Sequence, residues 1–256
     1  MKLSIFSKAN IVASENFNRW LVPPISISIH LCIGSVYAWS MFNPALTTSL
    51  GVVTSSANDW SLSDVVWIFS TAIVFLGLAA AFAGKWLEEV GPRLVGFVSA
   101  CLWGGGFLIG SIGIFFHELF LVYLGYGVLG GCGLGLGYVS PVSTLIRWFP
   151  DRRGMATGMA IMGFGGGAMI GAPLISYLLE LYYVTPVYLG SASDVILKTI
   201  DGIRYTDING VMTEVVVLAA GEVSNNTQLA GVYVVGSGDT GAGMTFVTLG
   251  IAYFII

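Results

Sequence analysis

Long apolar runs separated by short polar segments make up most of the first 183 residues of the chain. A hydrocarbon core of about 30 Å is crossed by about 20 helical residues. Runs of this kind cover residues 21–42, 65–82, 94–116, 119–139 and 155–179. The pattern predicts an all-α membrane protein with five transmembrane helices within residues 21–183, preceded by a polar segment at residues 1–20.

A sixth apolar run begins near Met244 and reaches Ile256. A helix that ended inside hydrocarbon would leave its last carbonyl groups without partners. We therefore expect residues 244–256 to be the start of a sixth span, and the sequence to be part of a longer protein. A short re-entrant tail is the alternative.

Residues 184–243 differ from everything before them. They contain charged side chains and short runs rich in β-branched residues, such as "IRYTD", "EVVVLAA" and "VYVV". Asn209-Gly210 lies between two of these runs, and this dipeptide is typical of a β-hairpin turn. About sixty residues are too many for a plain connection. We expect a small β-containing cap, with a disordered acidic loop as the alternative.

Composition supports a membrane location. Hydrophobic residues make up 55% of the chain and charged residues only 9%, against about 25% charged in a soluble domain. The polar start lacks the short apolar stretch and cleavage site of a signal peptide. Three cysteines, all within apolar runs, make a disulfide framework improbable. The net charge of −4 argues against a nucleic-acid partner.

Basic residues are distributed unevenly between the two sides of the predicted bundle. Eight of the ten precede the first span or lie between the second and third or the fourth and fifth spans, and only Lys198 and Arg204 lie on the other side. Basic residues favour the cytoplasmic side. We expect a cytoplasmic N-terminus, an extracytoplasmic cap, and a multi-pass protein of the inner (plasma) membrane.

Glycines are concentrated between Gly91 and Gly171, a segment that holds 21 of the 35. Two sets repeat every four residues, Gly127, Gly131 and Gly135 in the fourth span and Gly163, Gly167 and Gly171 in the fifth. Small residues at this spacing let helix backbones approach closely in a membrane. The repeats predict close, mobile helix packing, with a static dimer face as the alternative, and Pro173 predicts a bend.

Glycine patterns of a dinucleotide-binding fold occur twice but fail on context. One lies inside the apolar fourth span, and the other, ending at Gly241, leads into the sixth apolar run instead of a βαβ unit. His30 and His117 are far apart, and no cluster has metal-ligand spacing. We therefore predict no cofactor, no metal and no enzymatic activity.

Three stretches together resemble one family. "GSVYAWSMFNPAL" in the first span, "AGKWLEEVGPR" after the second and "RWFPDRRGMATGMAIMGFGGGAMIGAPL" into the fifth are similar to the oxalate/formate antiporter family of the major facilitator superfamily. The resemblance implies a secondary transporter of small carboxylates with twelve spans. It also implies that this chain is the N-terminal half of a major-facilitator-type bundle, and that a C-terminal half is its partner.

The resemblance also implies roles for the segment after the second span. Gly84, Glu88, Gly91 and Arg93 match the superfamily pattern of glycine, acid, glycine and base. Glu88 replaces the commoner Asp, and Glu89 occupies a place that is usually basic. An acid that faces a base or a helix N-terminus can act as a conformational latch; solvated charge that fixes topology is the alternative. The repeat from Gly163 to Pro173 likewise resembles a packing and hinge motif.

Polar residues in the first span suggest a substrate path. Helical spacing places His30, Gly34 and Tyr37 on one face, and a face of this kind suits a water-filled cavity. The resemblance adds neighbouring residues of the path, which are Trp39, Asn43 and Tyr126. A histidine on the path could relay protons. The alternatives are a Tyr37 hydroxyl bonded to another helix and a His30 that lies between helices without a transport role.

The sequence therefore predicts a carrier that moves a small organic anion across a lipid bilayer by alternating access. A membrane-embedded sensor or binding subunit, which uses the cap to detect a ligand, is the alternative from a different class of protein. A channel is a weaker third hypothesis, because the sequence contains no filter motif.

Overall fold

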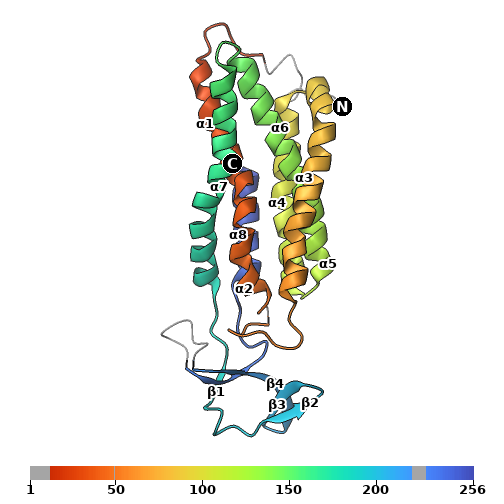
Figure 1. The fold of residues 1–256 in the computed structure, drawn as a ribbon, viewed down its shortest axis with the longest axis vertical. Coiled ribbons are helices and arrows are strands. Elements are labelled where there is room, and N and C mark those ends of the chain that lie inside the picture. Colours follow the sequence, from red (N-terminus) through yellow and green to blue (C-terminus); the bar gives the residue numbers. More distant parts are fainter. Residues whose placement is uncertain (1–11, 49, 221–228) are drawn as a thin grey trace.

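The computed structural model of the chain describes residues 12–48, 50–220 and 229–256. Its helices run side by side in one bundle, and a small antiparallel sheet lies beyond one end of that bundle (Figure 1). Five helical segments are long and apolar enough to cross a membrane. This architecture confirms the predicted helical membrane protein with a β-containing insertion.

The first span is not one regular helix. The short 3-10 helix η3 (Arg19–Leu21) leads into α1 (Val22–Gly34), and a second 3-10 helix, η4 (Ser35–Phe42), follows before α2 (Asn43–Leu46). Prolines occupy the first turn of α1, where the missing N–H group costs no hydrogen bond. In a 3-10 helix each residue advances by about 120°, so the side chains beyond Gly34 point in directions that regular α-helical spacing does not predict.

Helix α3 (Leu62–Val90) extends beyond the predicted second span, which ended at residue 82. The Ser61 hydroxyl accepts a hydrogen bond from the Asp64 N–H group at 3.2 Å and caps its start. The helix ends at Gly91, which has a φ of 88°, a backbone conformation that glycine adopts readily. Residues 84–90 are therefore helical and do not form the expected loop, because backbone hydrogen bonding continues after hydropathy falls.

Helix α4 (Pro92–Phe115) follows Gly91 directly. The fourth span consists of α5 (Leu119–Val122), the π-helix η5 (Tyr123–Gly130) and α6 (Gly131–Trp148). It ends at Trp148, beyond residue 139, where hydropathy predicted the end of the span. Helix α7 (Arg153–Tyr182) continues through Pro173 to Tyr182. Helix α8 (Ala242–Ile255) packs against α4 and α7.

The cap is a five-stranded antiparallel sheet with strand order β1-β5-β4-β3-β2. The strands are β1 (Tyr188–Gly190), β2 (Lys198–Ile200), β3 (Ile203–Ile208), β4 (Val211–Leu218) and β5 (Gly231–Val234). The predicted Asn209-Gly210 turn joins β3 to β4, with φ values of 55° and 86°. Positive φ at both positions is the geometry of a type I′ hairpin turn.

Three clusters of buried side chains occur among the described residues, and two of them fill the bundle and join it to the sheet. Aromatic side chains, including Trp39, Phe107, Tyr126 and Phe246, fill the interior of the bundle. A second cluster joins Val52, in the connection between α2 and α3, to Val216 and Tyr233 of the sheet. The sheet is therefore seated on this connection and has a fixed place relative to the bundle.

Candidate functional site

The side chains of the predicted substrate path separate into a buried group and an exposed group. His30 is fully buried and Gly34 is buried, whereas the side chain of Tyr37 is 49% exposed. Ser40 and Pro44 are exposed as well. The one continuous face expected for His30, Gly34 and Tyr37 is interrupted, because α7 covers its first part and the 3-10 turns of η4 rotate Tyr37 outward.

His30 lies between α6 and α7. Its ring meets the rings of Tyr138 and Phe164 edge to face, at centroid distances of 5.7 and 6.4 Å. Nδ1 lies 3.0 Å from the carbonyl oxygen of Ser26, which would make Nδ1 the donor. Nε2 is buried and has no hydrogen-bond partner among the described residues. The imidazole thus resembles the buried histidine of the alternative interpretation, with one nitrogen left unsatisfied.

Tyr37 projects from η4 on the open side of the bundle. Its ring packs at 5.1 Å from the ring of Phe164 and at 6.5 Å from that of Phe69. The structure gives its hydroxyl no hydrogen-bond partner among the described residues. The ring is therefore held by packing, while the hydroxyl is available to a polar molecule.

Three further predicted path residues occupy different surroundings. Trp39 is buried and its Nε1 donates to the carbonyl oxygen of Val65 at 3.2 Å. Its ring lies 4.4 Å from that of Tyr126, which is only 1% exposed. These two belong to the aromatic interior. Asn43 is half-buried, and its Oδ1 is buried without a hydrogen-bond partner in the described structure.

The predicted latch lies at the end of the bundle opposite the sheet. Gly84 and Glu88 are exposed on the last turns of α3, Gly91 ends that helix, and Arg93 is exposed on the first turn of α4. Arg147 of α6 reaches Glu88, with Nη2 3.4 Å from Oε1. This partner was missed by sequence reasoning, which used Arg147 only to orient the chain. The sequence feature that could have indicated this pair is the position of Arg147 at the end of the fourth span.

The glycine repeats lie where helices touch. In α6, a Cβ atom on Gly131 would come within 2.6 Å of the Ala72 carbonyl oxygen, and one on Gly135 within 2.5 Å of that of Leu76. Gly127 is less crowded, with Thr71 Cγ2 at 3.1 Å. Because Gly127 lies in η5, the repeat runs from η5 into α6, and its three glycines face α3.

The repeat of α7 faces the first span. A Cβ atom on Gly167 would lie 2.5 Å from the carbonyl carbon of Gly34, and one on Gly163 would lie 2.9 Å from Cβ of His30. Gly171 meets Ser35 Cβ at 3.0 Å. Pro173 follows on the next turn of the same continuous helix.

The sequence profile of the Major Facilitator Superfamily matches residues 30–193, which include four of the spans and most of the first. The chain belongs to the major facilitator superfamily. An uncharacterized MFS-type transporter of Escherichia coli, YhjX, is 33% identical over 151 residues, 59% of this chain and 35% of that protein.

Two further relatives match a similar share of this chain and of their own length. The apicoplast pyruvate carrier 1 of Toxoplasma gondii is 26% identical over 206 residues, 68% of this chain and 38% of the carrier. The oxalate:formate antiporter of Oxalobacter formigenes is 28% identical over 174 residues, 67% of this chain and 38% of the antiporter. The chain thus spans little more than a third of the length of these curated relatives.

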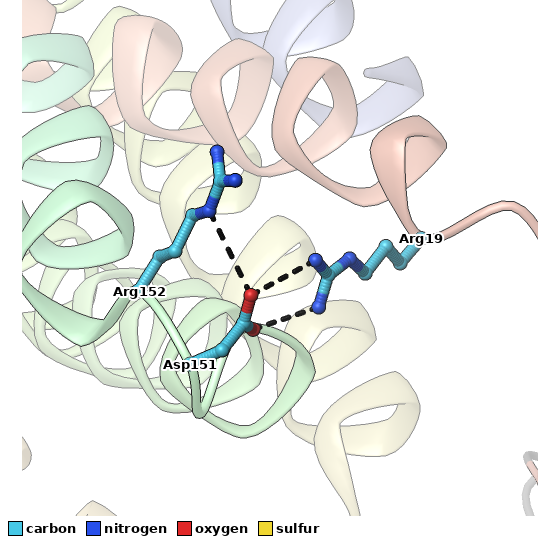
Figure 2. A network of polar contacts seen from close by, with 3 residues as sticks. All are labelled: Arg19, Asp151 and Arg152. Carbon is cyan, nitrogen blue, oxygen red and sulfur yellow. Dashed lines mark hydrogen bonds and ion pairs between the residues drawn. The ribbon is translucent and has the colours of Figure 1, made fainter.

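A second ion pair of this superfamily chain joins the start of the first span to the connection between α6 and α7 (Figure 2). Arg19 donates two hydrogen bonds to Asp151, at 2.7 and 3.0 Å, and Arg152 Nε lies 3.7 Å from the same carboxylate. The hydrogen bonds from Arg19 lower the pKa of Asp151 below its ordinary value. The Arg19 guanidinium also lies 4.8 Å from the centre of the Phe149 ring.

This network was not predicted. Arg19 was counted only among the basic residues that orient the chain, and Asp151 was assigned no role. Bidentate carboxylate binding is a property of arginine that spacing does not reveal between residues 132 positions apart. Among the described residues, no group of three or more His, Cys, Asp or Glu side chains is arranged to hold a metal ion.

Proposed function

We propose that this chain forms the N-terminal half of a secondary active transporter of small carboxylates. The observation that carries the proposal is the match to relatives named for carboxylates, a pyruvate carrier and an oxalate:formate antiporter, over two thirds of the chain. Human monocarboxylate transporter 11 matches as well, with 32% identity over 124 residues. Oxalate, formate and pyruvate are the substrates to test first.

Transport proceeds by alternating access in this proposal. A C-terminal half covers the open side of η4, and the two halves rock around a site near the membrane midplane. Tyr37 contributes its hydroxyl to that site, with Asn43 and Ser40 further along the same open side. His30, Gly34, Trp39 and Tyr126 hold the first span in position from behind.

A partner half is needed for chemical reasons. An anion in a low-dielectric site requires positive charge or well-aimed donors. The basic side chains of the five spans lie at helix ends, as Lys85, Arg93, Arg147 and Arg153 do. The second half therefore supplies the cation that binds the carboxylate, and the 256-residue chain alone does not transport.

The end of the bundle that carries these basic residues faces the cytoplasm in this proposal, and the sheet faces outward across the inner (plasma) membrane. Glu88 and Arg147 form part of the latch at the cytoplasmic end, together with Gly84, Gly91 and Arg93. Lipid surrounds the remaining apolar surface.

Uptake of labelled oxalate, formate and pyruvate into liposomes tests the proposal. The full-length protein should accumulate at least one of them with saturation, and the chain of 256 residues should accumulate none. A membrane-embedded sensor, the alternative, would bind a carboxylate without accumulation. Saturable uptake by the 256-residue chain would overturn the missing-half argument.

A further inference from the structure

A polar cavity of about 380 Å³ opens in the cap, where two strands separate. Strands β3 and β4 pair from Ile208↔Val211 to Tyr205↔Glu214, and beyond that point β4 pairs with β5. The edge of β4 at residues 215–217 that faces β3 therefore has no strand partner in the described sheet. Residues 54–57 of the α2–α3 connection close the cavity from the bundle side.

The cavity contains complementary polar groups. Arg204 of β3 lines it, is exposed, and forms no ion pair with any described residue. Glu214 lines it too, and Asn58 Nδ2 donates to its Oε2 at 3.0 Å. The Oγ atom of Ser56 is buried and has no hydrogen-bond partner within the described residues. A buried hydroxyl without a partner is costly, which suggests that a ligand or water binds there.

A second cavity, of about 660 Å³, continues from the first toward the bundle. Both cavities are lined by Ser55 and Ser56. The second is also lined by Ser40 and Asn43 at the outer end of the first span. Asn43 Oδ1 is likewise a buried acceptor without a hydrogen-bond partner among the described residues.

These volumes lie within the range of about 300–1,000 Å³ that is typical of small-molecule sites. Polar side chains thus run from the cap, through the shared serines, to the open side of η4, where Tyr37 lies.

We propose that the cap and the α2–α3 connection form an outer capture site for a small monocarboxylate. Arg204 binds the carboxylate, since a guanidinium donates two parallel hydrogen bonds to it. Ser56 binds the same ligand, and the shared serines lead it toward Asn43. This site rests on the proposed transport function, which it extends to the segment between residues 184 and 243.

Glu214 sets the selectivity of the capture site. Its negative charge in the same cavity repels a second carboxylate and accepts a hydrogen bond from a neutral donor. The site therefore favours pyruvate, formate or a hydroxy acid over the oxalate dianion.

The first test measures transport by the full-length protein in liposomes whose cap faces outward. Arg204→Ala should raise the half-saturating external pyruvate concentration about tenfold, the size of one lost charged hydrogen bond. Efflux from the inside should not change, and Arg204→Lys should lie between wild type and Arg204→Ala. Lys198→Ala is the matched control, because it removes an equal charge from a cap residue that lines a different cavity.

Equal effects of Arg204→Ala and Lys198→Ala, or no effect of either, would overturn the site. Glu214→Gln should narrow the preference for pyruvate over oxalate, because it removes the repulsion but keeps an acceptor for Asn58. An unchanged preference would contradict the selectivity argument.

A second test is independent of transport. The Ala57→Cys variant of the full-length protein, which keeps Arg204 and places a thiol in the lining of the same cavity, is labelled with a membrane-impermeant, negatively charged thiol reagent, with wild type as the blank for Cys32, Cys101 and Cys132. Pyruvate should slow labelling of Ala57→Cys but not of Lys198→Cys. If pyruvate slows the labelling but the wild-type protein takes up no pyruvate, the transport function is refuted and the capture site stands. If the wild-type protein takes up pyruvate but pyruvate does not slow the labelling, only the capture site is refuted.

Discussion

Two helix–helix interfaces within the bundle are each formed around a glycine repeat, but they join different pairs of helices. Helices α3 and α6 meet through the repeat at Gly127, Gly131 and Gly135, and the first span meets α7 through the repeat at Gly163, Gly167 and Gly171. Each interface also has an ion pair at the same end of the bundle, Glu88 with Arg147 in the first case and Arg19 with Asp151 in the second.

The two interfaces differ in closeness and in what lies beside them. Glycine occurs on one side of the α3–α6 interface, but on both sides of the contact between Gly34 and Gly167. At the α3–α6 interface, Arg147 Nη2 lies 3.4 Å from Glu88 Oε1. At the other interface, Arg19 donates two hydrogen bonds to Asp151, at 2.7 and 3.0 Å.

The interface with α7 is also the one that adjoins Tyr37, through Phe164. Helices in a membrane gain no hydrophobic energy from contact, so backbone approach and polar pairs decide their packing. We propose that the α1–α7 contact sets the position of the proposed substrate path, while the α3–α6 contact holds the bundle behind it.

The largest expected effects come from bulky residues in the two interfaces. Gly167→Leu and Gly131→Leu should each abolish transport, because a side chain would collide with the backbone of Gly34 or Ala72. Gly165→Leu and Gly77→Leu are matched controls, since nothing lies within 4 Å of a Cβ atom at either position. Liposome uptake and expression check the result, and full activity of both interface variants would show that these contacts are dispensable.

Substitution of glycine by alanine should affect the two interfaces differently. Gly34→Ala places a Cβ atom against the carbonyl oxygen of Phe164, which cannot move aside, so we expect transport to fall at least tenfold. Gly127→Ala meets the Thr71 side chain, with Cγ2 at 3.1 Å and Cβ at 3.3 Å, and the nearest backbone atom, the Ile68 carbonyl oxygen, is at 3.7 Å, so most activity should remain. Initial uptake rates are compared at matched expression. Equal losses of transport in the two variants would contradict a tighter contact between α1 and α7.

Tyr37→Phe tests whether the α1–α7 interface positions a substrate group. The substitution keeps the ring that packs on Phe164 and removes only the hydroxyl, so transport should fall several-fold with unchanged expression and thermal stability. Tyr177→Phe is a suitable control, because it removes a hydroxyl from an exposed tyrosine of α7. Unchanged kinetics of Tyr37→Phe would assign this residue to packing.

The ion pair of the α3–α6 interface should affect motion more than stability. Arg147→Gln removes an exposed contact, so the shift in Tm should be small. The transport rate should change several-fold if the pair is a latch, and Glu88→Gln should have the same effect without adding to it. Additive effects in the double variant would show that the two side chains act separately.

The smallest expected effect is on stability, from the ion pair between Arg19 and Asp151 at the interface of the first span with α7. Arg19 lowers the pKa of Asp151 in the folded protein, so the carboxylate contributes stability above its unfolded pKa of about 3.9 and loses it as pH falls through the lower folded value. The Tm difference between wild type and Asp151→Asn should therefore shrink below about pH 3.9. A constant difference between pH 7 and pH 3 would contradict this linkage.

Much of the fold was predictable because lipid imposes simple rules. Apolar runs of sufficient length located five spans, and Asn209-Gly210 located the hairpin of the sheet. Helix ends were less predictable. The second span continues to Val90 through charged residues, because helical hydrogen bonding does not stop where hydropathy falls.

The positions of the proposed substrate-path residues were predictable only in part. Spacing of three and four placed His30, Gly34 and Tyr37 on one face, but the 3-10 turns of η4 rotate that face midway. Trp39 and Tyr126 lie in the aromatic interior, which no local pattern distinguishes from a cavity lining. Arg147 and Asp151 acquired their partners only through contacts between distant segments.

The sequence by itself determined the class of protein, the spans, the glycine repeats and the hairpin, because each depends on neighbours along the chain or on the surrounding solvent. The tertiary structure alone decided which helix each repeat faces, which side chain of the first span is exposed, and that serines near residue 55 join Arg204 of the cap to Asn43 of the bundle. Such pairings depend on how packed helices and strands orient one another, and that information is not local.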